Sequence, residues 1–174
     1  MAGDILINSE RLYIRAPRPE DFDPLYQVVL SDAEVMRLAF QGQLSDRHAA
    51  IDFFSSILDH DATGRKPGIL IERSTNDVIG FGGPLLCSVL GAPDYEIGFV
   101  LARRTWGRGY ASEIGRAQIE YGFATLKLDR VLAQVSPENA ASIRVLERMG
   151  MQPCTTTETS GRGVRLVYAI YQSR

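Results

Sequence analysis

The 174-residue chain has little of what metal, redox or disulfide chemistry requires. It holds two cysteines, Cys87 and Cys154, and two histidines, His48 and His60. The cysteines are isolated and form no CxxC pair, which excludes a disulfide framework or a zinc ribbon and favours a reducing compartment. Neither histidine has a second metal ligand near it in the sequence. We therefore expect no metal site and a cytoplasmic protein.

Long apolar runs and an excess of charge are also missing. The longest stretch without a charged residue, residues 78–93, is broken by glycines and prolines and falls short of the roughly 20 apolar residues of a membrane-spanning helix. The chain starts with an acidic segment where a signal peptide would be basic. The net charge is -2 and no basic stripe is present, so we expect no membrane segment and no direct nucleic-acid binding.

What is present is the composition of a globular protein, with 45% hydrophobic and 23% charged residues. A chain of this length buries roughly two-thirds or more of its unfolded surface in one core. We expect a single domain over residues 1–174. The composition leaves open whether the protein is a monomer or a homodimer.

The spacing of apolar residues predicts a mixed α and β chain. Period-two patterns and short apolar runs predict β segments over residues 12–15, 68–72, 78–87, 95–101, 130–135, 152–157 and 164–171. Three-to-four spacing predicts helices over residues 19–30, 45–59 and 110–126, a short helical piece from residue 31, and a helix from residues 136–139 to Gly150. Pro84 predicts a bulge or an edge position late in its strand. Gly115 and Gly122 share one helix face and predict close packing there.

The segment RRTWGRGYASE, residues 103–113, joins the strand over 95–101 to the helix over 110–126. A helix N-terminus presents unpaired N–H groups and a dipole equivalent to about +0.5 charge, which attract phosphates. Gly107 and Gly109 allow those oxygens to reach the backbone, and Arg104 and Arg108 can add charge-assisted hydrogen bonds. Neither the Rossmann nor the Walker pattern matches. Taken alone, the loop is equally compatible with a tight turn that carries solvated arginines.

At this loop the sequence resembles the GNAT superfamily of N-acetyltransferases. Arg104-Thr-Trp-Gly-Arg-Gly109 fits the R/Q-x-x-G-x-G/A loop that binds the pyrophosphate of acetyl coenzyme A in that superfamily. Nearly the whole chain is similar to the RimJ and RimL type of ribosomal-protein N-terminal acetyltransferases. The landmarks of that likeness, in chain order, are ERLYIR (10–15), YEIGF (95–99), WGRGYASE (106–113) and PENAASIRVLERMG (137–150).

The resemblance implies an α/β (α+β) GNAT fold: a central mixed, mostly antiparallel twisted sheet of six to seven strands, with a splayed parallel pair and helices on both faces. It implies acetyl coenzyme A as cosubstrate and an amine acceptor. In such a splay the backbone of the strand before the loop is free to pair with the pantetheine arm and to stabilise an oxyanion. The implied cofactor-binding residues are Phe99, Val100, Leu101, Arg104, Gly107, Arg108, Gly109, Tyr110, Ala111, Asn139 and Ser142.

Two residues are candidates for moving protons during acyl transfer. Glu96 lies on the strand that would carry the thioester and can accept the ammonium proton through a water, although a strand glutamate is also compatible with an ordinary salt bridge. Many superfamily members have a tyrosine acid where this chain has Leu146. Asn139, Ser142 and Leu146 share one helix face, so Ser142 becomes the candidate donor to the sulfur. A helix serine more often bonds a preceding carbonyl.

The acceptor is expected to contact the elements that the cofactor does not use. These are the loop over 38–45 with Phe40 and Gln41, and the loop over 155–163 with Glu158, together with Glu96. A protein N-terminal α-amine, a polyamine, an aminoglycoside and a small amino compound all remain open. The alternative function is a catalytically idle coenzyme A-binding sensor or interaction domain.

Overall fold

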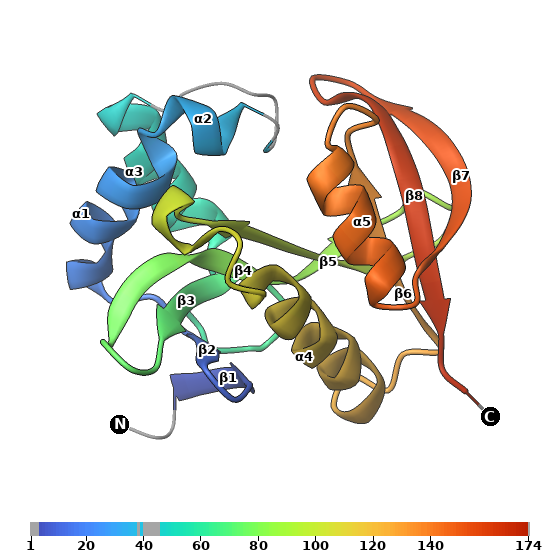
Figure 1. Cartoon of the computed structure of the whole chain (residues 1–174), viewed down its shortest axis with the longest axis horizontal. Helices are drawn as coiled ribbons and strands as arrows, with labels where there is room; N and C mark the ends of the chain where they lie inside the picture. Colours follow the sequence, from blue (N-terminus) through green and yellow to red (C-terminus); the bar gives the residue numbers. More distant parts are fainter. Residues whose placement is uncertain (1–3, 38, 40–45, 174) are drawn as a thin grey trace.

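A computed structural model describes residues 4–37, 39 and 46–173 (Figure 1). Its centre is one eight-stranded sheet in the order β1-β2-β3-β4-β5-β6-β8-β7. The strands are β1 (Ile5–Asn8), β2 (Leu12–Arg15), β3 (Gly68–Glu72), β4 (Asp77–Cys87), β5 (Asp94–Leu101), β6 (Arg130–Val135), β7 (Gln152–Thr159) and β8 (Gly163–Tyr171). Only the β5–β6 pair is parallel.

Seven of the eight strands were expected, and β1 was missed. It is four residues long and pairs only with β2, across a register shift between Ile5 and Ile7. The tight turn that reverses the chain is closed by the Ser9 N–H, which donates to the Leu12 carbonyl at 2.9 Å. So short an edge strand shows too few alternating residues to be recognised from the sequence.

The helical segments are η2 (Pro19–Asp21), α1 (Phe22–Leu25), η3 (Tyr26–Leu30), α2 (Ala33–Met36), α3 (Arg47–Ile57), η4 (Arg103–Thr105), α4 (Tyr110–Ala124) and α5 (Ala140–Arg148). The helix predicted over residues 19–30 is thus a 3₁₀ turn, an α turn and a π turn in succession. Asp46 caps α3 and Asn139 caps α5 through their side-chain oxygens. None of the described helices is long and apolar enough to cross a membrane.

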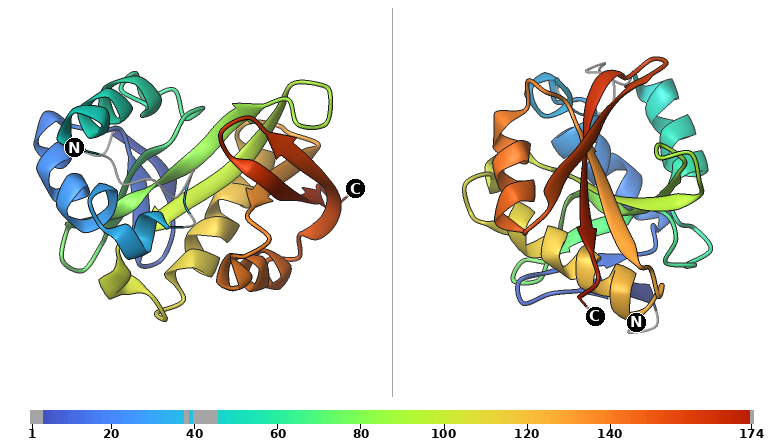
Figure 2. Two further views of the ribbon diagram at one scale, coloured as in Figure 1. Left: turned by 90° about the horizontal axis from the view of Figure 1, so that it is seen from above. Right: turned by 90° about the vertical axis from the view of Figure 1, so that its right-hand side faces the viewer.

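The helices cover both faces of the sheet (Figure 2). Alternation along β3 shows how: Ile69 and Ile71 pack into the core under α1 to α3, whereas Leu70 packs into the core under α4. A third core joins α5 to β6 and β8 through Leu146 and Tyr168. The two faces are therefore specified by the period of two within single strands.

Strands β5 and β6 separate soon after they meet. Glu96 and Leu132 form the one registered pair between them, and beyond Glu96 strand β5 pairs only with β4. Helix α4 connects the two strands, as expected for a parallel pair. In β4, pairing with β3 ends at Gly82, so Pro84 lies in a part that has β5 as its only neighbour, as predicted for an edge position.

The two helix glycines allow the close packing that the sequence predicts. A Cβ built on Gly115 would lie 2.2 Å from the Met149 sulfur, and one on Gly122 would lie 2.8 Å from a Val131 methyl. The Arg116 guanidinium also donates to the Arg148 carbonyl at 3.0 Å. Helix α4 is thereby held against α5 and β6, beside the splay.

Candidate active site

The loop between β5 and α4 forms a cradle of backbone amides over residues 106–111. Gly107 and Gly109 have φ angles of +74° and +79°, the left-handed region that glycine adopts at no cost. Gly109 is the N-cap of the 15-residue α4, and no side chain caps this helix. A Cβ on Gly107 would find no atom of the described chain within 4 Å. The first N–H groups of α4, at Tyr110 and Ala111, are thus available to an anion.

Glu72, at the end of β3, lies behind the cradle and was not anticipated. Its side chain is nearly inaccessible, with 2% of the residue exposed, and it accepts a hydrogen bond from the Tyr110 hydroxyl. Arg108 Nη2 lies 2.7 Å from one Glu72 oxygen and Arg104 Nη1 lies 3.9 Å from the other. The two arginines expected on phosphate therefore face this carboxylate, and Arg104 also donates to Asp77 at 3.3 Å.

Tyr110 connects the cradle to the N-terminal hairpin. The guanidinium carbons of Arg11 and Arg108 lie over its ring, 4.6 and 4.5 Å from the ring centre. Arg11 also donates to the Arg108 carbonyl at 3.0 Å and pairs with Glu113 at 2.7 Å. Because the Tyr110 side chain is buried, only its backbone can contact a ligand.

The environment of Glu72 favours its charged form. The hydrogen bond from Tyr110, and then the guanidiniums of Arg108 and Arg104, hold the pKa of Glu72 below its ordinary value, although burial raises it. The same hydrogen bond raises the pKa of the Tyr110 phenol, which stays a donor. The cradle is consequently supported from behind by a carboxylate that is ionised at neutral pH and has two cationic partners.

Beyond Glu96, alternate residues of β5 turn their backbone to the open side. The carbonyl oxygens of Gly98 and Val100 lie against Gly82 and Gly80 of β4, at 2.7 and 2.0 Å from a built Cβ. The backbone groups of Phe99 and Leu101 therefore face the splay. The Val100 carbonyl faces β4, and a cosubstrate contact of Val100 stays a prediction. The Leu101 carbonyl accepts from the Trp106 indole N–H at 2.9 Å, which leaves the Leu101 N–H toward the splay.

Helix α5 begins at the carboxyl end of β6, on the same sheet edge as the cradle. The Asn139 side-chain oxygen accepts from the Ser142 N–H at 3.1 Å, so the Asn139 amide hydrogens remain for a ligand. Ser55 and Ser56 both donate to carbonyls four residues earlier, whereas the Ser142 hydroxyl makes no hydrogen bond within the described chain. Leu146 is buried in the core under α5.

Glu96 lies where β5 and β6 begin to separate and is 6% exposed. Gln134 donates its amide N–H to one carboxylate oxygen, and Arg162 Nη1 lies 3.6 Å from the other. The side chain therefore has the ion pair that the sequence left open as the ordinary alternative to a base. It nonetheless stands beside the expected position of the acyl group.

Comparison with known proteins identifies this architecture. The acetyltransferase (GNAT) domain family matches residues 11–152. The chain belongs to the GNAT acetyltransferase family. It is 36% identical over 145 residues to the uncharacterised N-acetyltransferase p20 of Bacillus licheniformis, across 83% of this chain and 80% of that protein. This GNAT protein is an acetyl-CoA-dependent acetyltransferase, as the family is.

Solved structures share the GNAT fold along nearly the whole chain. A GNAT acetyltransferase from Bacillus anthracis superposes with a TM-score of 0.78 at 28% identity, over 95% of this chain and 97% of that one. A spermidine N-acetyltransferase from Vibrio cholerae, solved with CoA and spermine, has a TM-score of 0.73 over 93% and 96% of the two chains. Its identity of 16% supports the fold alone.

Of the residues predicted to contact the acceptor, the structure describes two, Glu96 and Glu158, and they do not face each other. Phe40 and Gln41 lie outside the described residues. Glu158 is exposed and pairs with Val164, one register position from the Thr157–Arg165 pair. Since neighbouring positions on a strand face opposite ways, Glu158 is turned away from Arg165 and from the Glu96 carboxylate that acts on it.

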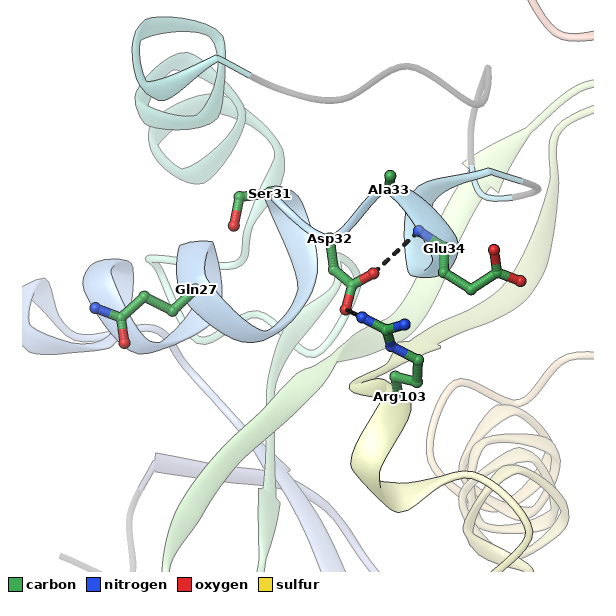
Figure 3. A pocket seen from close by; sticks show the side chains of 6 residues that line it. All are labelled: Gln27, Ser31, Asp32, Ala33, Glu34 and Arg103. Carbon is green, nitrogen blue, oxygen red and sulfur yellow. Dashed lines mark hydrogen bonds and ion pairs between the residues drawn. The ribbon is translucent and has the colours of Figure 1, made fainter.

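A surface pocket of about 420 Å³ lies away from the cradle (Figure 3). It is lined by Gln27, Ser31, Asp32, Ala33, Glu34 and Arg103. Asp32 caps α2 and pairs with Arg103 at 2.9 Å, and this ion pair links α2 to the loop after β5. None of the predicted cofactor or catalytic residues lines it, so we assign it no part in the reaction.

Several of these functional residues escaped the sequence reasoning: Glu72, Arg11, Gln134, Arg162 and Arg165. Glu72 ends the strand GILIE, in which every residue is buried, and a charge in so apolar a run is a usable signal. Gln134 and Arg165 are brought near Glu96 by strand pairing, whereas Arg11 and Arg162 lie in turns and meet partners that are far away in the sequence. Among the described residues, no three metal-ligating side chains gather at a possible metal site.

Proposed function

We propose that this protein transfers the acetyl group of acetyl-CoA to a primary amine by direct attack. The observation that carries the proposal is the uncapped, glycine-turned N-terminus of α4 at the same sheet edge as the open side of β5. A diphosphate on the cradle and an amide-bearing arm along β5 then belong to one ligand. From Leu101 to Glu96, strand geometry gives a path of about 16 Å for that arm.

Each part of the site has one task in binding the cosubstrate. The N–H groups of Tyr110 and Ala111 hold phosphate oxygens, and Arg104 and Arg108 neutralise charge beside them. Phe99 and Leu101 offer backbone groups to the arm, and Asn139 offers its amide hydrogens from across the splay. Bound acetyl-CoA supplies a thioester, whose acyl carbon an amine can attack.

Two protons must leave the acceptor nitrogen as the C–N bond forms and the C–S bond breaks. Glu96 accepts the ammonium proton, directly or through one water, before attack. Ser142 donates to the sulfur and is reprotonated by the second proton through solvent. A thiol pKa near 8.5 makes the thiolate a tolerable leaving group, so the Ser142 contribution is small.

The RimJ/RimL-like landmarks support a protein N-terminal α-amine as one acceptor class. Its pKa of about 7.7 to 8.0 makes deprotonation easier than for lysine. Small-molecule amines are the other class, since the same fold in the Vibrio cholerae enzyme carries the name of a spermidine acetyltransferase. Fold similarity does not choose between them.

The deciding experiment measures thiol release from acetyl-CoA across a panel of amines, with acetyl-CoA binding measured in parallel by calorimetry. We expect binding and amine-dependent release that Glu96→Gln reduces without changing affinity for acetyl-CoA. Binding without turnover on any amine would support the alternative, a catalytically idle sensor. Failure to bind acetyl-CoA would contradict both functions.

A further inference from the structure

Four polar side chains form a cluster at the apex of the splay. The apex cluster consists of Glu96 on β5, Gln134 on β6, Arg162 in the turn after β7 and Arg165 on β8. Glu96 and Arg165 are 6% and 5% exposed. Charges are expensive to bury, so a buried group of this kind in an enzyme requires an explanation beyond stability.

Alternation places the strand residues of the cluster on the sheet face opposite α4 and α5. Val100 packs under α1 to α3, and Glu96 lies two register steps before it on the same face. On β6 and β8, Ala133 and Tyr168 pack under α5, so the alternate positions occupied by Gln134 and Arg165 face the other way. The cradle and α5 thus serve one side of the splay, and the apex cluster serves the other.

The cluster carries more positive than negative charge. The cluster holds two guanidiniums and one carboxylate, and Arg162 and Glu96 are among the charges that act on Arg165. Desolvation, and then Arg162, lower the pKa of Arg165, as expected when like charges share a buried place.

Gln134 and Arg162 each have a polar atom that is buried without a hydrogen-bond partner in the described chain: the Gln134 side-chain oxygen and Arg162 Nε. One is an acceptor and the other a donor. On the same face of β5 as Glu96, Gly98 is exposed, and a Cβ built on it would meet no described atom within 4 Å. Among the described residues, the space over Gly98 is therefore open on the face of β5 that carries Glu96.

We propose that the acceptor is a small zwitterionic amine, such as an α-amino acid, whose ammonium binds Glu96 and whose carboxylate binds Arg162. This inference rests on the proposed acetyl transfer. The 3.6 Å contact between Arg162 and Glu96 is then replaced by two contacts with the acceptor. Glu96 is released from its cationic partner by the substrate itself, which frees the carboxylate to accept the ammonium proton.

The same charge distribution disfavours polycations. A polyamine or aminoglycoside places several positive charges near the reacting amine, and Arg162 and Arg165 repel them. Electrostatic complementarity governs selection of this kind, because juxtaposed like charges suppress the wrong partner. The acceptor is thereby assigned to a chemical class different from that named for the Vibrio cholerae structure.

The test measures thiol release from acetyl-CoA by the 174-residue protein with acceptor pairs that carry either a carboxylate or an uncharged carboxamide, and rates are compared at equal concentrations of free amine. The pairs are L-α-amino acids and their carboxamides, and spermidine is the polycation. We expect at least one acid to exceed its amide by about 10- to 100-fold in kcat/KM, the range of one charge-assisted hydrogen bond. An amide equal to its acid in every pair, or spermidine as the best acceptor, would overturn the proposal.

Variants then assign the effect to one side chain. Arg162→Gln is expected to bring the acid-to-amide ratio close to one, and Arg162→Lys to restore part of it. Arg73→Gln is the matched control, because Arg73 is exposed in the turn between β3 and β4. An acid-to-amide ratio that Arg162→Gln leaves unchanged would contradict the assignment. If Arg162→Gln does not fold, the acid-to-amide ratio of the Arg162→Lys variant is compared with the wild-type ratio, and this comparison decides the assignment.

A binding measurement separates this inference from the proposed function. Calorimetry in the presence of CoA follows amino acids and their amides on wild type and on Arg162→Gln. If no amine gives thiol release, but acids bind and Arg162→Gln abolishes that binding, the proposed function fails and the anion site stands. If thiol is released but acids bind both proteins equally, acetyl transfer stands and the anion site fails.

Discussion

The cradle before α4 and the apex cluster differ in what they are made of. The cradle presents backbone N–H groups, and the side chains around it, Glu72 and Arg11, hold it from behind. The apex cluster presents side chains brought together from three strands and a turn. A backbone site suits a cosubstrate common to a whole family, whereas a side-chain site can change its acceptor by single substitutions. The two regions should therefore respond differently to mutation.

The largest effect is expected from Gly109→Glu, which breaks the cradle and leaves the apex intact. The residue has φ +79°, and the new carboxylate would stand at the proposed phosphate site. Losing two charge-assisted hydrogen bonds weakens acetyl-CoA binding by about 100-fold or more. Calorimetry measures this, with Gly91→Glu as control, since Gly91 has φ +83° in a remote turn. Equal affinities in the two variants would contradict the cradle.

The same difference explains how much the sequence could predict. The cradle was located because RTWGRG holds its own information: two glycines, a preceding strand and a following helix lie within a few residues. The apex cluster depends on Glu96 meeting Gln134 and Arg162, which are 38 and more positions away in the chain. No local pattern encodes that contact. Strand positions were predictable from alternation, but the partner facing each strand was not.

Glu72→Ala is expected to have the second largest effect, through the support of the cradle. The buried Tyr110 hydroxyl loses its acceptor, and Arg108 loses its carboxylate. We expect the free energy of unfolding to fall by about 2 kcal/mol. The loss is not larger because both arginines are half exposed and water screens their charges. Urea unfolding measures it, and Glu158→Ala is the exposed control. A loss of unfolding free energy no greater than that of the control would show that the cradle is stable without the support of Glu72.

Gly98→Val examines the apex without touching the cradle. Gly98 is exposed on β5, and its Cβ position is open, so valine is accommodated and fills the space beside Glu96. We expect the acceptor KM to rise about tenfold, the effect of displacing one hydrogen-bonded group. Affinity for acetyl-CoA should stay unchanged, as calorimetry can verify. If instead the affinity for acetyl-CoA falls and the acceptor KM does not rise, the two faces of the splay have been assigned the wrong way round.

Ser142→Ala is expected to lower kcat by no more than about tenfold, with acetyl-CoA affinity retained. The hydroxyl makes no hydrogen bond within the part of the chain that the structure describes, so its removal costs little stability. Ser55→Ala is the control, since Ser55 donates to the Ile51 carbonyl at 2.8 Å on a different helix. Steady-state rates across pH compare the two. A wild-type rate at every pH would remove Ser142 from the reaction.

The smallest expected effect is a loss of stability at low pH, and it should arise from Glu72 behind the cradle. Because the pKa of Glu72 is lower in the folded protein, its charge contributes stability above its ordinary pKa, and this contribution is lost as pH falls through the folded value. Glu72→Gln keeps the shape without the titration. The difference in unfolding free energy between wild type and this variant should narrow as pH drops below about 4.3. A difference that stays constant with pH would mean that the cradle relies on the shape of Glu72 and not on its charge.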